Sequence, residues 1–132
     1  MNNMKLELLR AGEAKKTNKY HVTTAPDRTV DGICFDSRAE MNRYLELLMC
    51  QHAGSISDLE CQVAYELVPK HVRKDGTKCR GIRYIADFRY LDRRSNKVVV
   101  EDVKGALTEA YRIKRTLLLY RYPDLNFVEV RG

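Results

Sequence analysis

The sequence predicts an α+β, or mixed α/β, domain in which a mixed central sheet is flanked by helices. Residues 37–53 carry apolar side chains at helical spacing, and three extended segments follow between residues 62 and 105. A second helical stretch, residues 108–122, precedes a final strand over 125–130. The predicted order is therefore helix, three strands, helix and strand, with no internal repeat, which is typical of a layered domain.

The first predicted helix has both a start signal and a stop signal. Ser37 opens it, Glu40 completes a capping-box signature, and Gly54 can end it in a left-handed conformation. The stripe expected to face the core consists of Met41, Tyr44, Leu45, Leu48 and His52. This spacing predicts one amphipathic helix packed on a sheet.

Turn residues separate the extended segments. Pro69, near the end of the first segment, indicates an edge strand, and the pair Asp75-Gly76 marks a hairpin turn before the second segment, residues 82–91. Period-two alternation predicts the core positions Val63, Tyr65, Leu67, Tyr84, Ala86, Phe88 and Tyr90. The last four of these share one face of the second segment, and Asp87 lies on the other.

The second predicted helix is amphipathic and basic. Thr108 can cap it, and Pro123 ends it. Its buried stripe is predicted to include Ala110, Ile113 and Leu117. Its remaining surface carries Arg112, Lys114, Arg115 and Arg121.

The composition of the chain limits the class of partner that the protein is expected to bind. The chain has 132 residues, with 24 Lys and Arg against 18 Asp and Glu, which gives a formal net charge of +6. A chain of this length forms one domain, so a single surface must serve both binding and chemistry. The positive charge favours nucleic acid or an acidic membrane surface over a neutral metabolite, although a merely basic soluble surface would give the same count.

The first 28 residues are polar and basic, so we expect a poorly packed N-terminal arm before a folded domain over residues 29–132. The four cysteines include no C-x-x-C pair, and neither a zinc site nor a disulfide framework is expected. We find no secretory segment and no apolar run long enough to span a membrane, and we therefore expect a cytoplasmic protein.

The stretch VVVEDVKG, residues 98–105, ends a predicted strand with charged side chains. A period of two places Asp102 and Lys104 on one face and turns Glu101 to the other, as a structural or supporting acid. The strand end is therefore a candidate site for chemistry.

Asp87 and Asp102 are expected to be neighbours. Simple hairpin pairing would set Asp87 opposite Val100, with Asp102 diagonally adjacent at roughly 7–8 Å between side chains. Two such carboxylates raise each other's pKa unless a cation neutralises them. A divalent metal ion can bridge them, and an ion-pair cluster with Lys104 on the sheet surface is the structural alternative.

These residues resemble a known superfamily. Asp87 within YIADF, followed by Asp102-Val103-Lys104, resembles the PD-(D/E)XK nuclease signature, and the predicted element order resembles its restriction-endonuclease-like αβββαβ core. The motifs FDSRAE, ISDLECQVAYEL, YIADF, VEDVKG and TEAYRIKR together resemble small phage and prophage proteins that are generally taken to be nucleases of this superfamily. The resemblance covers roughly residues 30–132, and Ala86 stands where the signature has proline.

The resemblance implies a metal site. Asp87 and Asp102 would bind Mg²⁺ or Mn²⁺, the Val103 carbonyl would add a ligand, and Lys104 would position or activate the attacking water. Glu40 corresponds to the first-helix acid that many members use as a further ligand. Capping the helix is its alternative role, and the two roles can coexist.

Residues around this set are weaker candidates. Lys114 and Tyr111, with Arg112 and Arg115 beside them, are expected to contact the backbone of a bound strand, with a solvated helix surface as the alternative. Gln62 and Glu60 are expected to support the metal cluster.

The function expected from this resemblance is a Mg²⁺-dependent DNA endonuclease. It would hydrolyse phosphodiester bonds in branched DNA, as a Holliday junction resolvase does, and would act as a homodimer in the bacterial cytoplasm during phage DNA metabolism. Two alternatives stay open. One is a nicking enzyme acting on mismatched or linear duplex DNA, and the other is a non-catalytic nucleic-acid-binding module on the same fold.

Overall fold

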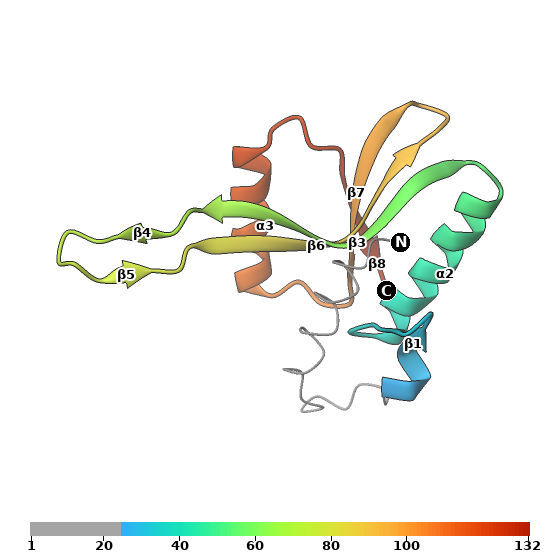
Figure 1. Ribbon diagram of the computed structural model, residues 1–132, viewed down its shortest axis with the longest axis horizontal. Helices are drawn as coiled ribbons and strands as arrows, with labels where there is room; N and C mark the ends of the chain where they lie inside the picture. Colours follow the sequence, from blue (N-terminus) through green and yellow to red (C-terminus); the bar gives the residue numbers. More distant parts are fainter. Residues whose placement is uncertain (1–24) are drawn as a thin grey trace.

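The computed structural model describes residues 25–132 and forms a mixed sheet with a helix on each face (Figure 1). The elements are η1 (Ala25–Arg28), β1 (Thr29–Val30), β2 (Ile33–Cys34), α2 (Arg38–His52), β3 (Ile56–Val68), β4 (His71–Val72), β5 (Lys78–Cys79), β6 (Ile82–Asp92), β7 (Lys97–Lys104), α3 (Glu109–Arg121) and β8 (Phe127–Arg131). The central sheet has the order β3-β6-β7-β8, antiparallel except for the parallel pair β7 and β8. The predicted fold class and element order are confirmed.

The expected N-terminal arm lies mostly outside the described residues. Its last four residues form the 3₁₀ turn η1, where Arg28 is buried and its carbonyl accepts a hydrogen bond from the Phe35 N–H at 3.0 Å. The folded domain therefore begins before residue 29. None of the helices within residues 25–132 is both long and apolar enough to cross a membrane.

Two clusters of buried side chains lie on opposite faces of the sheet. The cluster under α2 contains Tyr44, Leu47 and Val99, whereas the cluster under α3 contains Val100 and Leu118. Val99 and Val100 are consecutive residues of β7, so the pleat sends them to opposite faces. Each helix therefore covers its own face of one shared sheet.

Both helices are rotated relative to the predicted stripes. Helix α2 buries Glu40, Tyr44 and Leu47, while the predicted Leu45 and His52 are exposed. Helix α3 buries Tyr111 and Leu118 and half-buries Leu117, while the predicted Ala110 and Ile113 are exposed. The rotation buries polar groups, namely the carboxylate of Glu40 and the hydroxyl of Tyr111. A pattern based on hydropathy alone does not predict polar groups on a buried face.

The predicted core face of β6 is divided between the two clusters. All four residues are buried, but Tyr84 and Ala86 pack under α3 whereas Phe88 and Tyr90 pack under α2. The change of face occurs at Asp87. On the neighbouring strand Gln62 has a φ of 55°, between the pairs Cys61↔Phe88 and Val63↔Ala86, and this left-handed residue interrupts the pleat.

Strands β3 and β6 continue beyond the sheet as a two-stranded extension, which we call the hairpin arm, residues 69–81 (Figure 1). The predicted turn at Asp75-Gly76 is confirmed at its tip, where the Thr77 N–H donates to the Asp75 carboxylate at 2.9 Å. At its base Gly81 has a φ of +84°, and a Cβ there would lie 2.3 Å from the Val68 carbonyl oxygen. Close backbone contact at Gly81 therefore sets the direction of the arm.

Gly81→Ala should destabilise the protein by about 2 kcal/mol or more, because an unfavourable left-handed backbone adds to a backbone clash. Urea unfolding followed by circular dichroism measures this change. Gly76→Ala is the matched control, since Gly76 has a φ of +87° but open space around its Cβ position. Equal losses in both variants would show that the close contact at Gly81 contributes nothing.

Candidate active site

The predicted acids of β6 and β7 lie next to each other where the pairing of these two strands ends. The last pair is Phe88 with Glu101, so Val100 lies opposite Arg89 and not opposite Asp87 as predicted. Asp87 Oδ2 accepts a hydrogen bond from the Val103 N–H at 2.7 Å, and Asp102 is among the groups that act on Asp87. The prediction that these acids are neighbours is confirmed, and its register was wrong by two positions.

The two carboxylate oxygens of Asp102 have different surroundings. It is 1% exposed, and its Oδ2 accepts a hydrogen bond from the Tyr84 hydroxyl and lies 3.3 Å from Lys104 Nζ. Its Oδ1 is buried and has no hydrogen-bond partner within the described chain. Buried polar atoms are nearly always satisfied, so this oxygen is a candidate to bind a cation or to accept a hydrogen bond from a protonated Asp87.

Glu40 reaches the same region from the first turn of α2. It is 3% exposed, and its Oε1 accepts a hydrogen bond from Gln62 Nε2 at 3.1 Å. Ser37 caps the helix by accepting from the Glu40 N–H at 3.1 Å, as predicted. The reciprocal bond of the capping box differs, because the Glu40 carboxylate accepts from the N–H of Asp36 instead of that of Ser37. Glu40 therefore serves the helix start and also faces the acids.

Two further acids affect the ionisation of Asp87. Its pKa is raised to about 10, first by burial, then by the charge of Glu40, and then by Asp102. The hydrogen bond from the Val103 N–H opposes this rise only in part. Carboxyl groups packed this way share protons or bind a cation.

The acids carry the type of oxygen ligand that a hard divalent cation prefers. Within residues 25–132, no group of three or more His, Cys, Asp or Glu side chains is placed so that it could hold a metal ion. The unpartnered Oδ1 of Asp102 and the adjacent Asp87 nevertheless offer carboxylate oxygens, the ligands that Mg²⁺ and Mn²⁺ prefer.

The backbone of β7 adds a carbonyl on the same side. The Val100 N–H and the Lys104 carbonyl both bond toward β8 or the residues flanking it. Alternate residues of a strand direct their backbone groups to opposite neighbours, so the Val103 carbonyl points toward β6 and Asp87, as its N–H does. This orientation agrees with the predicted ligand role of Val103.

A hollow of about 290 Å³ opens beside Asp102. It is lined by Arg83, Tyr84, Ile85, Asp102, Lys104, Ala110, Tyr111 and Lys114. Lys104 Nζ lies 4.8 Å from the centroid of the Tyr111 ring, which directs the ammonium group into this space. The structure therefore brings Lys104, Tyr111 and Lys114 together, as the sequence predicts.

Comparison with known proteins identifies the family of this chain. A family model described as "Protein of unknown function (DUF1064)" matches residues 17–131. The chain belongs to this family. A search of curated proteins found no match, and a search of solved structures found none either. The DUF1064 description states no activity, so function must be argued from the site.

Two further predicted nucleic-acid contacts of this DUF1064 member do not line the hollow at Asp102. Arg115 Nη1 donates to Glu129 at 2.6 Å, and Glu129 also accepts a hydrogen bond from the Tyr111 hydroxyl. The Arg115 guanidinium lies 5.4 Å from the centroid of the Tyr111 ring, so Arg115 holds a wall of the hollow in place. Arg112 lines a separate groove on α3.

The residues predicted to support the acids lie in different places. Gln62 contacts Glu40, as expected of a supporting residue, but Glu60 is engaged by Arg89 along the sheet. Glu101 lies on the face under α2, where it is 1% exposed. The prediction that Glu101 turns away from Asp102 is confirmed, and its role is structural.

Sequence reasoning missed two residues that organise the acids. Tyr84 was assigned only to the core, yet its hydroxyl donates to Asp102. Arg43 received no role, but its Nε and Nη2 donate to the two carboxylate oxygens of Glu101 at 2.7 and 2.8 Å. Both contacts join residues far apart in sequence. The hydroxyl of Tyr84 on a predicted core face was a signal for the first contact, whereas Arg43 lay outside the predicted stripe and gave none.

The raised pKa of Asp87 makes the metal-free protein sensitive to pH. The folded-state pKa exceeds the unfolded value, so its contribution to stability is fully present below the unfolded pKa and is lost as pH rises toward 10. Asp87→Asn keeps an oxygen for the Val103 N–H and removes the titration. In EDTA at about pH 9 the folded wild type must hold a proton on Asp87 that the unfolded chain has lost, so this variant should be roughly 1–3 kcal/mol more stable than the wild type.

Urea unfolding in EDTA between about pH 5 and pH 9 tests this, and the two proteins should converge at the acid end. Mg²⁺ or Mn²⁺ should stabilise the wild type more than the variant. Parallel pH profiles for the two proteins would contradict the assignment of a shared carboxyl cluster.

Proposed function

We propose that this protein is a metal-dependent DNA endonuclease of the PD-(D/E)XK type. The observation that supports the proposal is the buried Asp102 carboxylate, which has Lys104 Nζ 3.3 Å from its Oδ2 and no hydrogen-bond donor at its Oδ1 within the described residues. Asp87, beside it, and Glu40 are buried acids as well. A purely structural ion-pair cluster needs neither a third buried acid nor an unpartnered Asp102 Oδ1. Such an arrangement is costly unless it binds something.

The chemistry would divide between the metal and the chain. When bound, Mg²⁺ or Mn²⁺ acidifies a water molecule near neutral pH and offsets charge on the phosphate oxygens. Tyr84 orients Asp102, and Gln62 orients Glu40, by the hydrogen bonds already described. Lys104 places its ammonium group beside Asp102, where it can hold the attacking water or a phosphate oxygen.

The hollow beside Asp102 suits a phosphate-bearing ligand. Arg83, Lys104 and Lys114 supply positive charge around it, and Tyr111 supplies an aromatic wall. Basic side chains next to an aromatic ring are typical of nucleic-acid surfaces. The net charge of +6 is consistent with the same partner.

The substrate proposed is branched DNA, with a homodimer as the active species in the cytoplasm of a bacterial host. Support for these finer points comes from the resemblance of the motifs to small phage nucleases. Two copies of one site would cut a symmetric junction on two strands.

The deciding experiment is a cleavage assay with the wild-type protein on four DNA substrates of equal length: a four-way junction, a flap, a mismatched duplex and a linear duplex. Each is incubated with Mg²⁺, with Mn²⁺ and with EDTA. The proposal expects metal-dependent products, mostly from the junction. Products mainly from mismatched or linear duplex would indicate a nicking enzyme, and salt-dependent binding without any product would indicate a non-catalytic module.

A further inference from the structure

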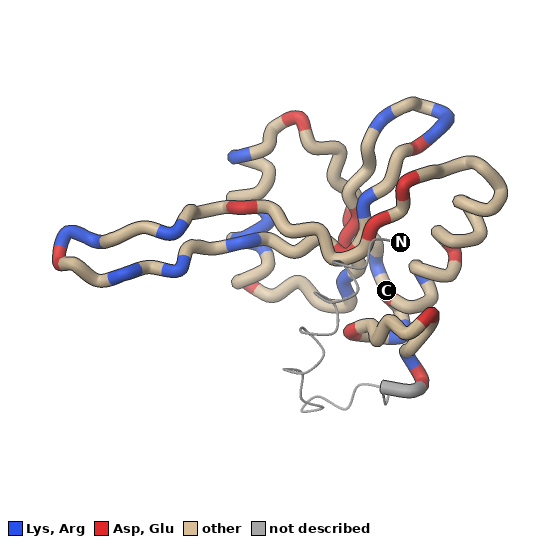
Figure 2. The backbone as a smooth tube through the Cα atoms, viewed as in Figure 1, with Lys and Arg blue, Asp and Glu red and all other residues tan. Residues whose placement is uncertain are grey.

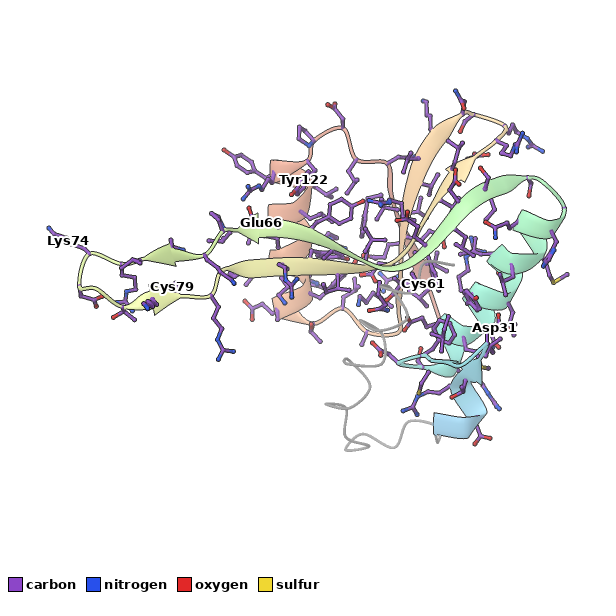
Figure 3. All side chains as sticks on the ribbon, viewed as in Figure 1. Asp31, Cys61, Glu66, Lys74, Cys79 and Tyr122 are labelled. Atoms are coloured by element: carbon purple, nitrogen blue, oxygen red, sulfur yellow. The ribbon has the colours of Figure 1, made fainter. Side chains whose placement is uncertain are left out.

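The hairpin arm projects beyond the rest of the domain. It continues β3 and β6 away from both helices (Figure 1), and every residue from 70 to 78 is exposed. Figure 3 shows Lys74 at the far end of the arm and Glu66 where the arm leaves the sheet. Close backbone packing at Gly81 directs the arm, so its projection is built into the fold.

The charged side chains of the arm are predominantly cationic. Its basic residues are Lys70, Arg73, Lys74, Lys78 and Arg80. Asp75 is its one acid, and it lies 3.4 Å from Arg73 at the tip. Figure 2 shows the basic positions on both strands of the arm. A second copy of this chain, which itself carries +6, is a poor partner for such a surface, whereas a polyanion is a good one.

The positive charge of the arm continues into the candidate active site. A hollow of about 570 Å³ at the base of the arm is lined by Glu66, Val68, Lys70, Arg80, Gly81 and Arg83. Arg83 also lines the hollow that contains Asp102 and Lys104. One cationic track therefore leads from the acids, through Arg83, to the tip of the arm.

The dimensions of the arm match a duplex. The six residue steps from Gly76 at the tip to Ile82 at the start of β6 span at most roughly 20 Å, about six base-pair steps. A two-stranded ribbon fits the major groove of B-form DNA, whereas the major groove of A-form RNA is too narrow for side chains to read.

We propose that the hairpin arm binds duplex DNA flanking the cleavage position, with its basic side chains contacting phosphates along the major groove. This inference rests on the proposed function for the choice of DNA as the partner. The arm extends the contact of one protomer well beyond the acids. It therefore contributes affinity and orientation and takes no part in the chemistry.

Binding in EDTA tests the arm independently of cleavage. Lys74→Gln, Lys78→Gln and Arg80→Gln are combined in an arm variant, because these residues are exposed and make no described ion pair. Arg93→Gln, Arg94→Gln and Lys97→Gln form the matched control, which removes the same charge from the exposed β6–β7 turn. Fluorescence anisotropy with a labelled duplex of roughly 20 base pairs, over a range of salt concentrations, gives affinity and salt slope.

The arm variant should bind at least about tenfold more weakly than the wild type, and its salt slope should fall by about 2 to 3, one unit for each lost phosphate contact. The control variant should stay close to the wild type, and both should retain the wild-type circular dichroism spectrum. Equal losses in the two variants, or none in the arm variant, would overturn the proposal. An arm-dependent loss of the same size with duplex RNA would overturn the groove assignment.

The two proposals fail separately. If the arm variant loses affinity but the wild type cleaves none of the four DNA substrates, the arm binds DNA and the nuclease proposal is wrong. If the wild type cleaves with Mg²⁺ while the arm variant binds and cleaves normally, the nuclease stands and the arm is not its DNA contact.

Discussion

Asp102→Asn should lower Mg²⁺-dependent cleavage of a four-way junction at least about a hundredfold, since even partners of metal ligands change activity by 10- to 100-fold. The substitution removes the charge of the carboxylate whose Oδ1 is unpartnered and whose Oδ2 lies next to Lys104. Initial cleavage rates with a saturating metal concentration provide the measurement.

The fold of this variant should survive, because asparagine keeps an oxygen that can accept from the Tyr84 hydroxyl. Circular dichroism and the urea midpoint are the checks. DNA binding in EDTA should also persist, since most of the affinity comes from basic side chains elsewhere. Cleavage at the wild-type rate would remove Asp102 from the site.

Glu101→Gln should reduce stability rather than cleavage, in contrast to Asp102→Asn. The free energy of unfolding should fall by about 2–4 kcal/mol, as expected when one partner of a buried ion pair is removed. Glu101 is the adjacent acid in the sequence, but it accepts two hydrogen bonds from Arg43 and one from the Tyr90 hydroxyl. These contacts anchor α2 on β7. The measurement is urea unfolding at neutral pH.

Per folded molecule, cleavage by Glu101→Gln should stay near the wild-type rate, since the side chain lies on the face opposite Asp102. Arg43→Gln should lose stability by a similar amount, and the double variant should lose less than the sum of the two, because each single change already breaks the same pair. Additive losses, or a hundredfold loss of cleavage in Glu101→Gln, would contradict this division of roles.

The elements that sequence reasoning found correctly depend on neighbours in the chain. The Ser37 cap, the Asp75-Gly76 turn and the opposite faces of Glu101 and Asp102 are confirmed. Each follows from contacts within a few residues or from the period of an extended strand. Asp87 and Asp102 could be placed on their strands for the same reason, since their positions in β6 and β7 follow from local pattern.

Long-range contacts account for what the sequence did not reveal. The approach of Asp87 to Asp102 depends on the β6–β7 register, which was predicted two positions away. The division of β6 between two clusters depends on the left-handed Gln62 in the neighbouring strand. The hydrogen bond of Tyr84 to Asp102 depends on both.

The sequence alone therefore determined the order of the elements, their caps and turns, and which acid of the VEDVKG strand faces the candidate site. Only the tertiary structure decided which carboxylates meet, which oxygen is left without a partner, and where the basic arm points. The physical reason is the range of the interactions. Helix caps and pleat parity act between near neighbours, whereas strand register, burial and the pKa of Asp87 are set by residues distant in the chain.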